Sequence, residues 1–374
     1  MQQRERARPA IPVRWHEDGE ENEVTHELKT GGDRGYLRIA TEEAFATEEQ
    51  LDAILQLVKD GKADKGTVSL WGFYGTSPSE RTTFIRERLL DVGELRLKAM
   101  DDTGIDKAIL SLTSPGVQPF PDAEKAKAMV RRANDFLKTR CEAHPDRFYG
   151  TVSIAPQDAA WSAEEIRRGK EELGFHAVMV NSHTQGHYLD EEQFDPILRA
   201  CAENDLPLYI HPQGPPDDLI GGMVEAGLDG AVFGFGVETS YHALRLLTTG
   251  VFDRYPSLQL MLGHGCEALP YWLYRNDYMH KAGIRSQRYP RLKPLQHDLF
   301  HYMRNNVLGT TSGLPFPPAI KLMLEVMGED RVMYAMDYPY EYVADEVRAH
   351  DLLDIPDATK KKLMQTNAER WFKL

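Results

Sequence analysis

The sequence predicts an α/β fold of the (β/α)8 barrel (TIM barrel) type, because eight short apolar runs alternate with segments of helical periodicity. No Gly/Ser-rich or Pro-rich linker divides the chain after residue 35. No glycine-rich phosphate fingerprint follows any run, which argues against a doubly wound open sheet. The predicted strands lie within residues 36–41, 107–113, 147–156, 175–182, 206–212, 258–265, 305–313 and 331–339.

The predicted helices occupy the segments between these runs, for example residues 79–104, 122–144 and 190–205. We therefore expect one domain over residues 36–374. Residues 46–104 form a long insertion after the first strand, expected to be a lid or an oligomer contact. Residues 1–35 are basic and then acidic and lack the apolar core of a signal peptide, so we expect a flexible N-terminal arm, which could wrap a neighbouring subunit.

The overall charge excludes several classes of partner. The chain has 374 residues, with 44 Lys and Arg against 58 Asp and Glu, a net charge of −14. This balance argues against nucleic acid or an anionic membrane as partner, but it allows an anionic small molecule held by a few local arginines. No apolar run approaches the ~18 residues of a membrane span. The three cysteines are scattered, which excludes a disulfide framework and favours a cytoplasmic location.

Reactive side chains stand at the ends of particular predicted strands. Glu42 ends the first run, His211 the fifth and Asp337 the eighth. In a (β/α)8 barrel the strand ends meet at one mouth, where the chemistry is done. Two carboxylates and one imidazole form a three-ligand site with open positions, as catalytic metals require. With a single nitrogen donor, the set favours Mn²⁺, with Zn²⁺ or Mg²⁺ as alternatives, and we expect no organic cofactor.

The first strand contains two consecutive glutamates with different expected roles. Strict alternation places Glu42 and Ala44 on one face of the strand and Glu43 on the other. We expect Glu42 to face the mouth and Glu43 to face the helices as a structural residue. Ala44 has no side chain that could bind a metal, so a coordination position is left for water or for two substrate oxygens.

Residues 263–275 are predicted to open a helix after the sixth strand. His264 stands at the strand end with Glu267 three residues later, a pair that suits proton handling, although Glu267 could instead cap the helix. Arg275 is expected near the same helix face as Glu267. Arg81 and Arg275 are candidates to bind an anionic substrate, and Phe235 is an aromatic candidate for stacking on a planar ligand.

The motifs of the chain resemble those of hydroxybenzoate decarboxylases of the amidohydrolase superfamily, and within them the group that acts on 5-carboxyvanillate. The resemblance covers about residues 28–374 and rests on long ungapped stretches. These are IATEEAFAT (39–47), YIHP (209–212), GFGVET (234–239), VMGEDRVMYAMDYPY (326–340) and QTNAERWFKL (365–374). Two segments depart from the family pattern, namely Gly265-Cys266 and the loop at 211–222, and both bear on the choice of substrate.

This resemblance implies an amidohydrolase-type barrel with Mn²⁺ on Glu42, His211 and Asp337. It implies that Asp337 donates a proton to the substrate ring, with His264 as its partner. The implied reaction is non-oxidative decarboxylation of 5-carboxyvanillate to vanillate and CO2, in a homodimer or homotetramer. The residues implied around the substrate are Arg81, Arg275, Phe235 and Tyr340.

Three alternatives remain at the level of the sequence. One is a decarboxylase of a different hydroxybenzoate. Another is a metal-dependent lactonase or amidase on the same fold, although such hydrolases typically keep a His-x-His pair on the first strand, where this chain has Glu42 and Ala44. The third is a barrel without catalytic activity that serves as a binding subunit.

Overall fold

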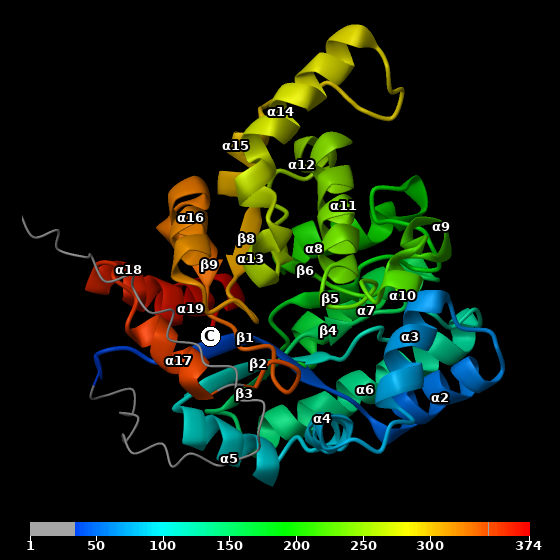
Figure 1. Ribbon diagram of the computed structural model, residues 1–374, viewed down its shortest axis with the longest axis vertical. Helices are drawn as coiled ribbons and strands as arrows, with labels where there is room; N and C mark the ends of the chain where they lie inside the picture. The colour runs from blue at the N-terminus through cyan, green and yellow to red at the C-terminus, as the bar shows by residue number, and fades with distance from the viewer. Residues whose placement is uncertain (1–33, 343) are drawn as a thin grey trace, which may run out of the picture.

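The computed structural model describes residues 34–342 and 344–374, and the expected arm at 1–35 lies almost entirely outside them. Within the described residues, parallel strands form the wall of a barrel surrounded by helices (Figure 1). Pairing runs from β1 to β3 in one ladder and from β4 to β9 in the other, and β3 and β4 are two parts of one barrel strand split at Thr151. The strands are β1 (Ile39–Phe45), β2 (Lys107–Leu112), β3 (Phe148–Gly150), β4 (Val152–Ser153), β5 (Val178–Asn181), β6 (Leu208–His211), β7 (Leu260–Leu262), β8 (Val307–Thr310) and β9 (Val332–Met333).

The barrel closes where the segment after β9 runs beside β1. The backbone N–H of Thr41 donates to the carbonyl of Tyr334 (3.1 Å), and that of Asp337 donates to the carbonyl of Glu42 (3.0 Å). The N–H of Ala44 donates to the carbonyl of Tyr338 (2.7 Å). Each predicted apolar run contains or overlaps one barrel strand, although β1 continues past the first run to Phe45, and the prediction of a (β/α)8 fold is confirmed.

The helices form an outer layer and an insertion. The insertion after β1 contains α2 (Glu48–Lys59), α3 (Lys65–Tyr74), α4 (Glu80–Leu90) and α5 (Glu94–Thr103). Thr47, Asp64 and Ser79 cap the first three of these helices by accepting a backbone hydrogen bond in the first turn. The other helices are α6 (Ala123–Ala143), α7 (Ala159–Glu171), α8 (Asp195–Asn204), α9 (Asp217–Ile220), α10 (Met223–Ala226), α11 (Gly234–Thr248), α12 (Val251–Arg254), α13 (His264–Glu267), α14 (Leu269–Ser286), α15 (Leu299–Asn305), α16 (Pro317–Met327), α17 (Ala344–Asp351), α18 (Asp357–Lys361) and α19 (Asn367–Phe372).

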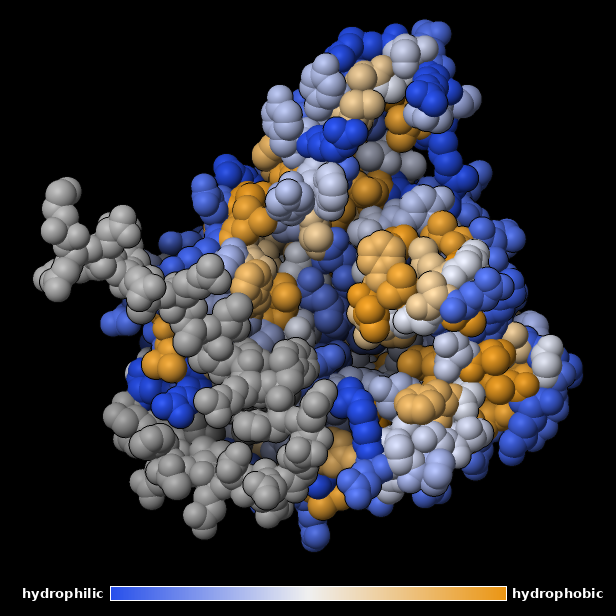
Figure 2. Space-filling view, viewed as in Figure 1, coloured by the Kyte–Doolittle hydropathy of each residue, from blue (hydrophilic) through white to orange (hydrophobic). Residues whose placement is uncertain are grey.

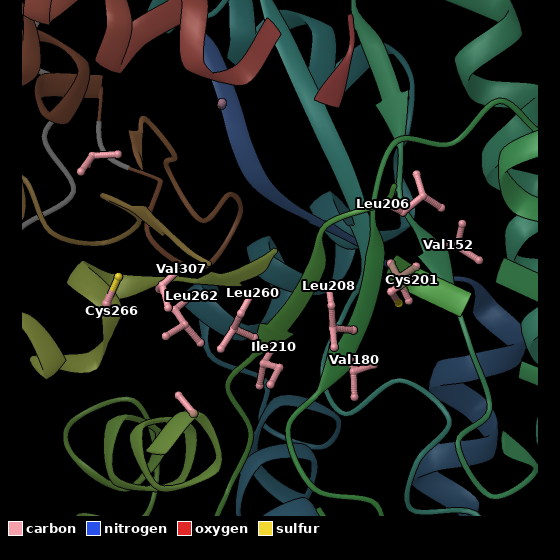
Figure 3. Packing of buried hydrophobic residues seen from close by; sticks show 14 of the residues in the cluster. Val152, Val180, Cys201, Leu206, Leu208, Ile210, Leu260, Leu262, Cys266 and Val307 are labelled. Atoms are coloured by element: carbon pink, nitrogen blue, oxygen red, sulfur yellow. The ribbon is translucent and has the colours of Figure 1, made fainter. Parts of the chain in front are cut away.

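Two apolar layers separate the inside of the barrel from its outside. Ile39, Ile109, Met261 and Met333 belong to an interior cluster that also includes Phe372 of α19. A larger cluster lies between the strands and the outer helices. Figure 3 shows part of that outer layer, with side chains from adjacent strands including Val180, Leu208, Ile210, Leu260, Leu262 and Val307. The alternation of these two layers follows the two-residue period of each strand.

A bulge in β1 breaks that alternation. Ala40 pairs with Ala108 and Glu43 pairs with Leu110, so three steps along β1 match two along β2. Ile39 lies in the interior cluster, and strict alternation from it would turn Glu43 into the barrel. Because the bulge inserts one residue, Glu42 faces the barrel mouth instead.

Helix α14 projects from the barrel at the top of Figure 1. Large side chains on it are open to solvent, including Tyr271, Tyr274 and Tyr278. Among the described residues, no helix combines the length and apolar character needed to span a membrane.

Candidate metal centre and substrate pocket

Three side chains meet at the barrel mouth with the geometry of a metal site. Glu42 lies on β1, His211 ends β6, and Asp337 follows β9. One ligand atom from each lies within 4.8 Å of the others, although 295 residues of sequence separate the first from the last. The three strand-end residues proposed from the sequence are therefore brought together.

The hydrogen bonds around these residues leave the expected ligand atoms free. The buried atoms Glu42 Oε1 and Asp337 Oδ1 have no hydrogen-bond partner among the described residues. The Nδ1 atom of His211 lies 2.8 Å from the carbonyl oxygen of Pro212, so that Nδ1–H donates and Nε2 keeps its lone pair. Nε2 lies 3.6 Å from Glu42 Oε1. Unpaired buried carboxylate oxygens are costly, so this donor set fits a bound divalent cation.

Glu42 is fixed by two hydroxyl groups at the end of β8. Thr310 (3.0 Å) and Ser312 both donate to Glu42 Oε2, which leaves Oε1 for the metal. Burial by itself would raise the pKa of Glu42, but the imidazoles of His264 and His211 together with hydroxyl hydrogen bonds lower the pKa. Sequence reasoning missed both hydroxyls. The signal was the hydroxyl-rich end of the seventh run, GTTSG at 309–313.

His264 joins the metal site to Glu267. Its Nδ1 lies 3.0 Å from Glu267 Oε1, and its Nε2 lies 3.6 Å from Asp337 Oδ2 and 3.7 Å from Glu42 Oε1. Burial would lower the pKa of His264, but the surrounding carboxylates raise it well above its usual value. Burial raises the pKa of Asp337 to about 7, against the opposing effect of His264. The pair of Asp337 and His264 can therefore hold a proton near neutral pH.

The regular helix expected within residues 263–275 begins only after a turn. His264, Cys266, Glu267 and Ala268 all have φ between 48° and 60°, so residues 264–268 form a left-handed turn and the regular helix α14 begins at Leu269. This turn directs His264 toward the metal ligands. Because Glu267 lies in this turn and Arg275 lies in α14, the two residues do not share one helix face as expected.

A cavity of about 1100 Å³ opens above the metal ligands. Figure 2 shows apolar residues on both sides of a hollow near the middle of this face. Helices α3 and α4 of the insertion form one wall and the segment leading into α11 forms another. The role of the insertion as a lid or an oligomer contact stays a prediction. The candidate site residues that line the cavity are His211, His264, Glu267, Asp337, Arg81, Phe235 and Tyr340.

Arg81 and Tyr340 are linked at the rim of the cavity. The guanidinium of Arg81 donates to the carbonyl of Tyr340 (3.0 Å), and the Tyr340 hydroxyl lies 2.7 Å from Thr113 Oγ1. Glu341 also lines the cavity and was missed by sequence reasoning. Burial raises the pKa of Glu341, against the opposing charge of Arg81.

Of the four candidates for substrate binding, Arg275 is the one that does not line this cavity among the described residues. It lies exposed on α14, between Trp272 and Asn276, which do line the cavity. The expectation that Arg275 faces the substrate within its own chain is therefore not met.

The comparison with protein families shows to which family the chain belongs. A family model described as amidohydrolase matches residues 87–374. The chain belongs to the amidohydrolase family. The match covers β2 to β9 and thus includes two of the three expected metal ligands, His211 and Asp337.

Solved structures of this amidohydrolase family resemble the chain along most of its length. A 5-carboxyvanillate decarboxylase from Novosphingobium aromaticivorans, crystallised with manganese and 4-hydroxy-3-methoxy-5-nitrobenzoic acid, is 65% identical, with a TM-score of 0.92 over 93% of this chain and 99% of that one. A 5-carboxyvanillate decarboxylase from Sphingomonas paucimobilis is 37% identical, with a TM-score of 0.86 over 91% of this chain and 99% of that one. By sequence, a gamma-resorcylate decarboxylase from a Polaromonas species is 34% identical over 90% of this chain and 98% of its own length.

Proposed function

We propose that this amidohydrolase is a manganese-dependent, non-oxidative decarboxylase that converts 5-carboxyvanillate to vanillate and CO2. The observation that carries the proposal is the set formed by Glu42, His211, Asp337 and His264 at one barrel mouth. It joins a three-donor metal site to a protonatable pair within one cavity. The manganese-containing relative at 65% identity supports both the metal and the substrate class.

The substrate would be oriented by the metal site on one side and by Arg81 on the other. A divalent cation on Glu42, His211 and Asp337 supplies Lewis-acid stabilisation of negative charge on the phenolate and carboxylate oxygens of the substrate. Arg81 would bind the second carboxylate of the ring through its guanidinium. Phe235 and Tyr340 would contact the ring faces and exclude water.

Asp337 would deliver the proton that makes the carboxylate a leaving group. A proton placed on the ring carbon that bears the carboxylate interrupts aromaticity. When the carbon–carbon bond breaks, its electron pair returns to the ring and CO2 departs, so the proton on the ring replaces the carboxylate. His264 would serve as the proton partner of Asp337, and Glu267 would orient His264 through Nδ1.

We also propose a homodimer or homotetramer formed through α14, acting in the cytoplasm. Tyr271 and Tyr274 on this helix are more than 70% exposed, and such aromatic side chains are typical of subunit interfaces. In this arrangement Arg275 would serve the cavity of a neighbouring subunit. The three cysteines are free thiols, which supports a reducing location.

The substrate proposal is tested by ultraviolet spectroscopy of the protein with Mn²⁺ and 5-carboxyvanillate, with parallel detection of CO2. We expect equimolar vanillate and CO2, and slower or no turnover of gamma-resorcylate and 2,3-dihydroxybenzoate. If the protein turns over only one of these other hydroxybenzoates, that compound becomes the proposed substrate instead of 5-carboxyvanillate. If the spectra stay unchanged across the whole panel and the protein cleaves a lactone or an amide, the proposal of a decarboxylase is refuted in favour of a hydrolase.

The proton-transfer role is tested by Asp337→Asn. The amide keeps one oxygen for the metal but cannot supply the proton, so we expect kcat to fall by roughly 10³-fold or more while bound Mn²⁺ is retained. Asp190→Asn is the matched control, since the Asp190 side chain is also buried but pairs with Arg245, away from the cavity. Near-normal kcat in Asp337→Asn would contradict the mechanism.

The oligomer is tested by light scattering and by mixing two inactive variants. Tyr274→Glu should yield monomers if α14 forms the interface, and a monomeric wild-type protein would refute the proposal. If Arg275 serves a neighbouring subunit, mixing Arg275→Ala with Asp337→Asn should restore activity, because a mixed dimer contains one complete site. No recovery in verified mixed dimers would assign Arg275 to its own chain or to no site.

A further inference from the structure

Glu43, the neighbour of the metal ligand Glu42, makes a contact that the proposed reaction does not use. Its side chain is buried, with 3% exposed, and its two carboxylate oxygens accept hydrogen bonds from two backbone amides. The N–H of Met336 donates to Oε1 (3.1 Å) and the N–H of Tyr338 donates to Oε2 (3.2 Å). The carboxylate thus holds the chain on both sides of Asp337.

The backbone of Asp337 needs such support. Its φ of 64° lies in the left-handed region, which is unfavourable for a residue other than glycine and persists only where surrounding contacts enforce it. The Asp337 N–H donates to the carbonyl of Glu42 (3.0 Å), and the Asp337 carbonyl accepts from the N–H of Glu341 (3.0 Å). Within the described residues, Glu43 supplies the acceptors for the amides before and after this position.

The bulge in β1 makes this arrangement possible. It turns Glu42 into the barrel mouth and Glu43 outward, toward the segment that follows β9. Two consecutive glutamates of one strand, Glu42 and Glu43, therefore both contact the region of Asp337. Glu42 shares the metal site with the Asp337 side chain, while Glu43 bonds to the backbone around it.

A buried arginine lies close to Glu43. Arg96 of α5 is 1% exposed, and its guanidinium lies 4.7 Å from the centre of the Tyr338 ring and donates to the carbonyl of Ala44. Burial raises the pKa of Glu43 to about 8, and the charge of Arg96 opposes this rise. Glu346 of α17 also acts on Glu43 electrostatically, but it makes no hydrogen bond to Met336 or Tyr338. Through Arg96, the insertion therefore bonds to the backbone of β1 directly after Glu42 and Glu43.

We propose that Glu43 is a positioning residue that fixes the left-handed backbone of Asp337, and thereby both metal affinity and proton delivery. This inference rests on the proposed function, because it assigns Asp337 to the metal and to the substrate proton. It predicts that loss of the Glu43 carboxylate moves the Asp337 side chain without removing any ligand atom or substrate contact.

The test compares Glu43→Gln and Glu43→Ala with Glu346→Gln, a buried carboxylate of the same region. Mn²⁺ dissociation constants are measured by electron paramagnetic resonance, and kcat and KM at saturating Mn²⁺. Loss of an outer-shell partner typically weakens a metal site by about 10–100-fold. We expect about 10-fold weaker Mn²⁺ binding in Glu43→Gln, which keeps one acceptor, and about 100-fold in Glu43→Ala, with kcat reduced and KM nearly unchanged.

The control Glu346→Gln should leave Mn²⁺ affinity and kcat near the wild-type values. Wild-type Mn²⁺ affinity and kcat in folded Glu43→Ala would overturn the inference, and so would equal losses in Glu43→Ala and Glu346→Gln. If a Glu43 variant fails to fold, Glu43→Asp takes its place, since its shorter side chain cannot reach both amides.

Hydrogen exchange of the metal-free wild-type protein, resolved to single amides, provides a test that needs no variant. The amides of Met336 and Tyr338 should be protected, whereas exchange as fast as that of the exposed loop residue Val232 would overturn the inference. This experiment distinguishes the two proposals. Protected amides in a protein that neither binds Mn²⁺ nor releases CO2 would support the role of Glu43 in the backbone and refute the proposed function.

Discussion

Replacing Gly263 with alanine should weaken the metal site by a purely steric effect. Gly263 follows β7 with φ −77° and ψ −176°, a conformation that alanine adopts without strain. A methyl group there would lie 2.7 Å and 2.9 Å from the two carboxylate oxygens of Glu42 and 2.9 Å from the hydroxyl of Tyr209. Ordinary contacts of this kind are about 3.4 Å or longer, so the Glu42 carboxylate must move by roughly 0.5–0.7 Å.

A displacement of this size matters because metal and catalytic groups must be held within about 0.5 Å of their productive positions. We expect Mn²⁺ affinity to fall about 10–100-fold in Gly263→Ala, equivalent to about 1.4–2.7 kcal/mol. The assay is a titration with Mn²⁺ followed by electron paramagnetic resonance, with kcat measured at saturating metal. The melting temperature of the metal-free protein should change little.

The matched control is Gly72→Ala on helix α3. A methyl group at Gly72 meets no atom within 4 Å, so this change should leave Mn²⁺ affinity unaltered and stabilise the helix by up to about 1 kcal/mol. Wild-type Mn²⁺ affinity and kcat in Gly263→Ala would refute the reasoning, because Glu42 would then tolerate displacement or would not bind the metal.

Three further predictions concern pH, metal and the lid. Burial lowers the pKa of His350 to about 4, below its unfolded value near 6.5, so its contribution is complete above pH 6.5 and is lost as pH falls toward 4. His350→Gln should therefore remove up to about 3 kcal/mol of the acid-induced loss of unfolding free energy, and an unchanged pH profile in chemical denaturation would contradict this. Removing metal with a chelator should abolish activity and lower the melting temperature, and Mn²⁺ at 100 times its Kd should restore about 2.7 kcal/mol; full activity of protein shown to be metal-free would exclude a metal role. Gly214→Ala should raise KM with little change in Mn²⁺ affinity, because the new methyl group would lie 2.6 Å from the Cα of Gly66 and push α3 away from the cavity; an unchanged KM would show that the lid absorbs the shift.

Much of the fold was predictable because it follows from local patterns. Each barrel strand falls within or overlaps one apolar run, since buried parallel strands need continuous apolar sequence. Glu42, His211 and Asp337 were predictable because strand ends collect at one mouth of a barrel, so a reactive residue at the end of a run has a defined location. This rule also brought His264 to the site, although the turn that positions it was not predicted.

The details that were missed depend on contacts between distant segments. Thr310 and Ser312 became important only because the end of β8 lies against Glu42 in the folded barrel, and alternation along one strand cannot reveal a hydroxyl donor from another. Arg275 was misplaced because a left-handed turn precedes α14, and helical periodicity assumes an uninterrupted helix. Glu43 was correctly expected to face outward, but its bonds to the backbone around Asp337 lie beyond any local pattern.

The sequence by itself determined the barrel, the insertion and the residue types of the metal site, because these depend on apolar period and on the chemistry at strand ends. The tertiary structure decided the direction in which those residues point. The bulge in β1 and the positive φ angles of His264 and Asp337 set the geometry of the metal ligands. Such conformations are locally unfavourable and are stabilised only by partners from other strands, so no single segment could have specified them.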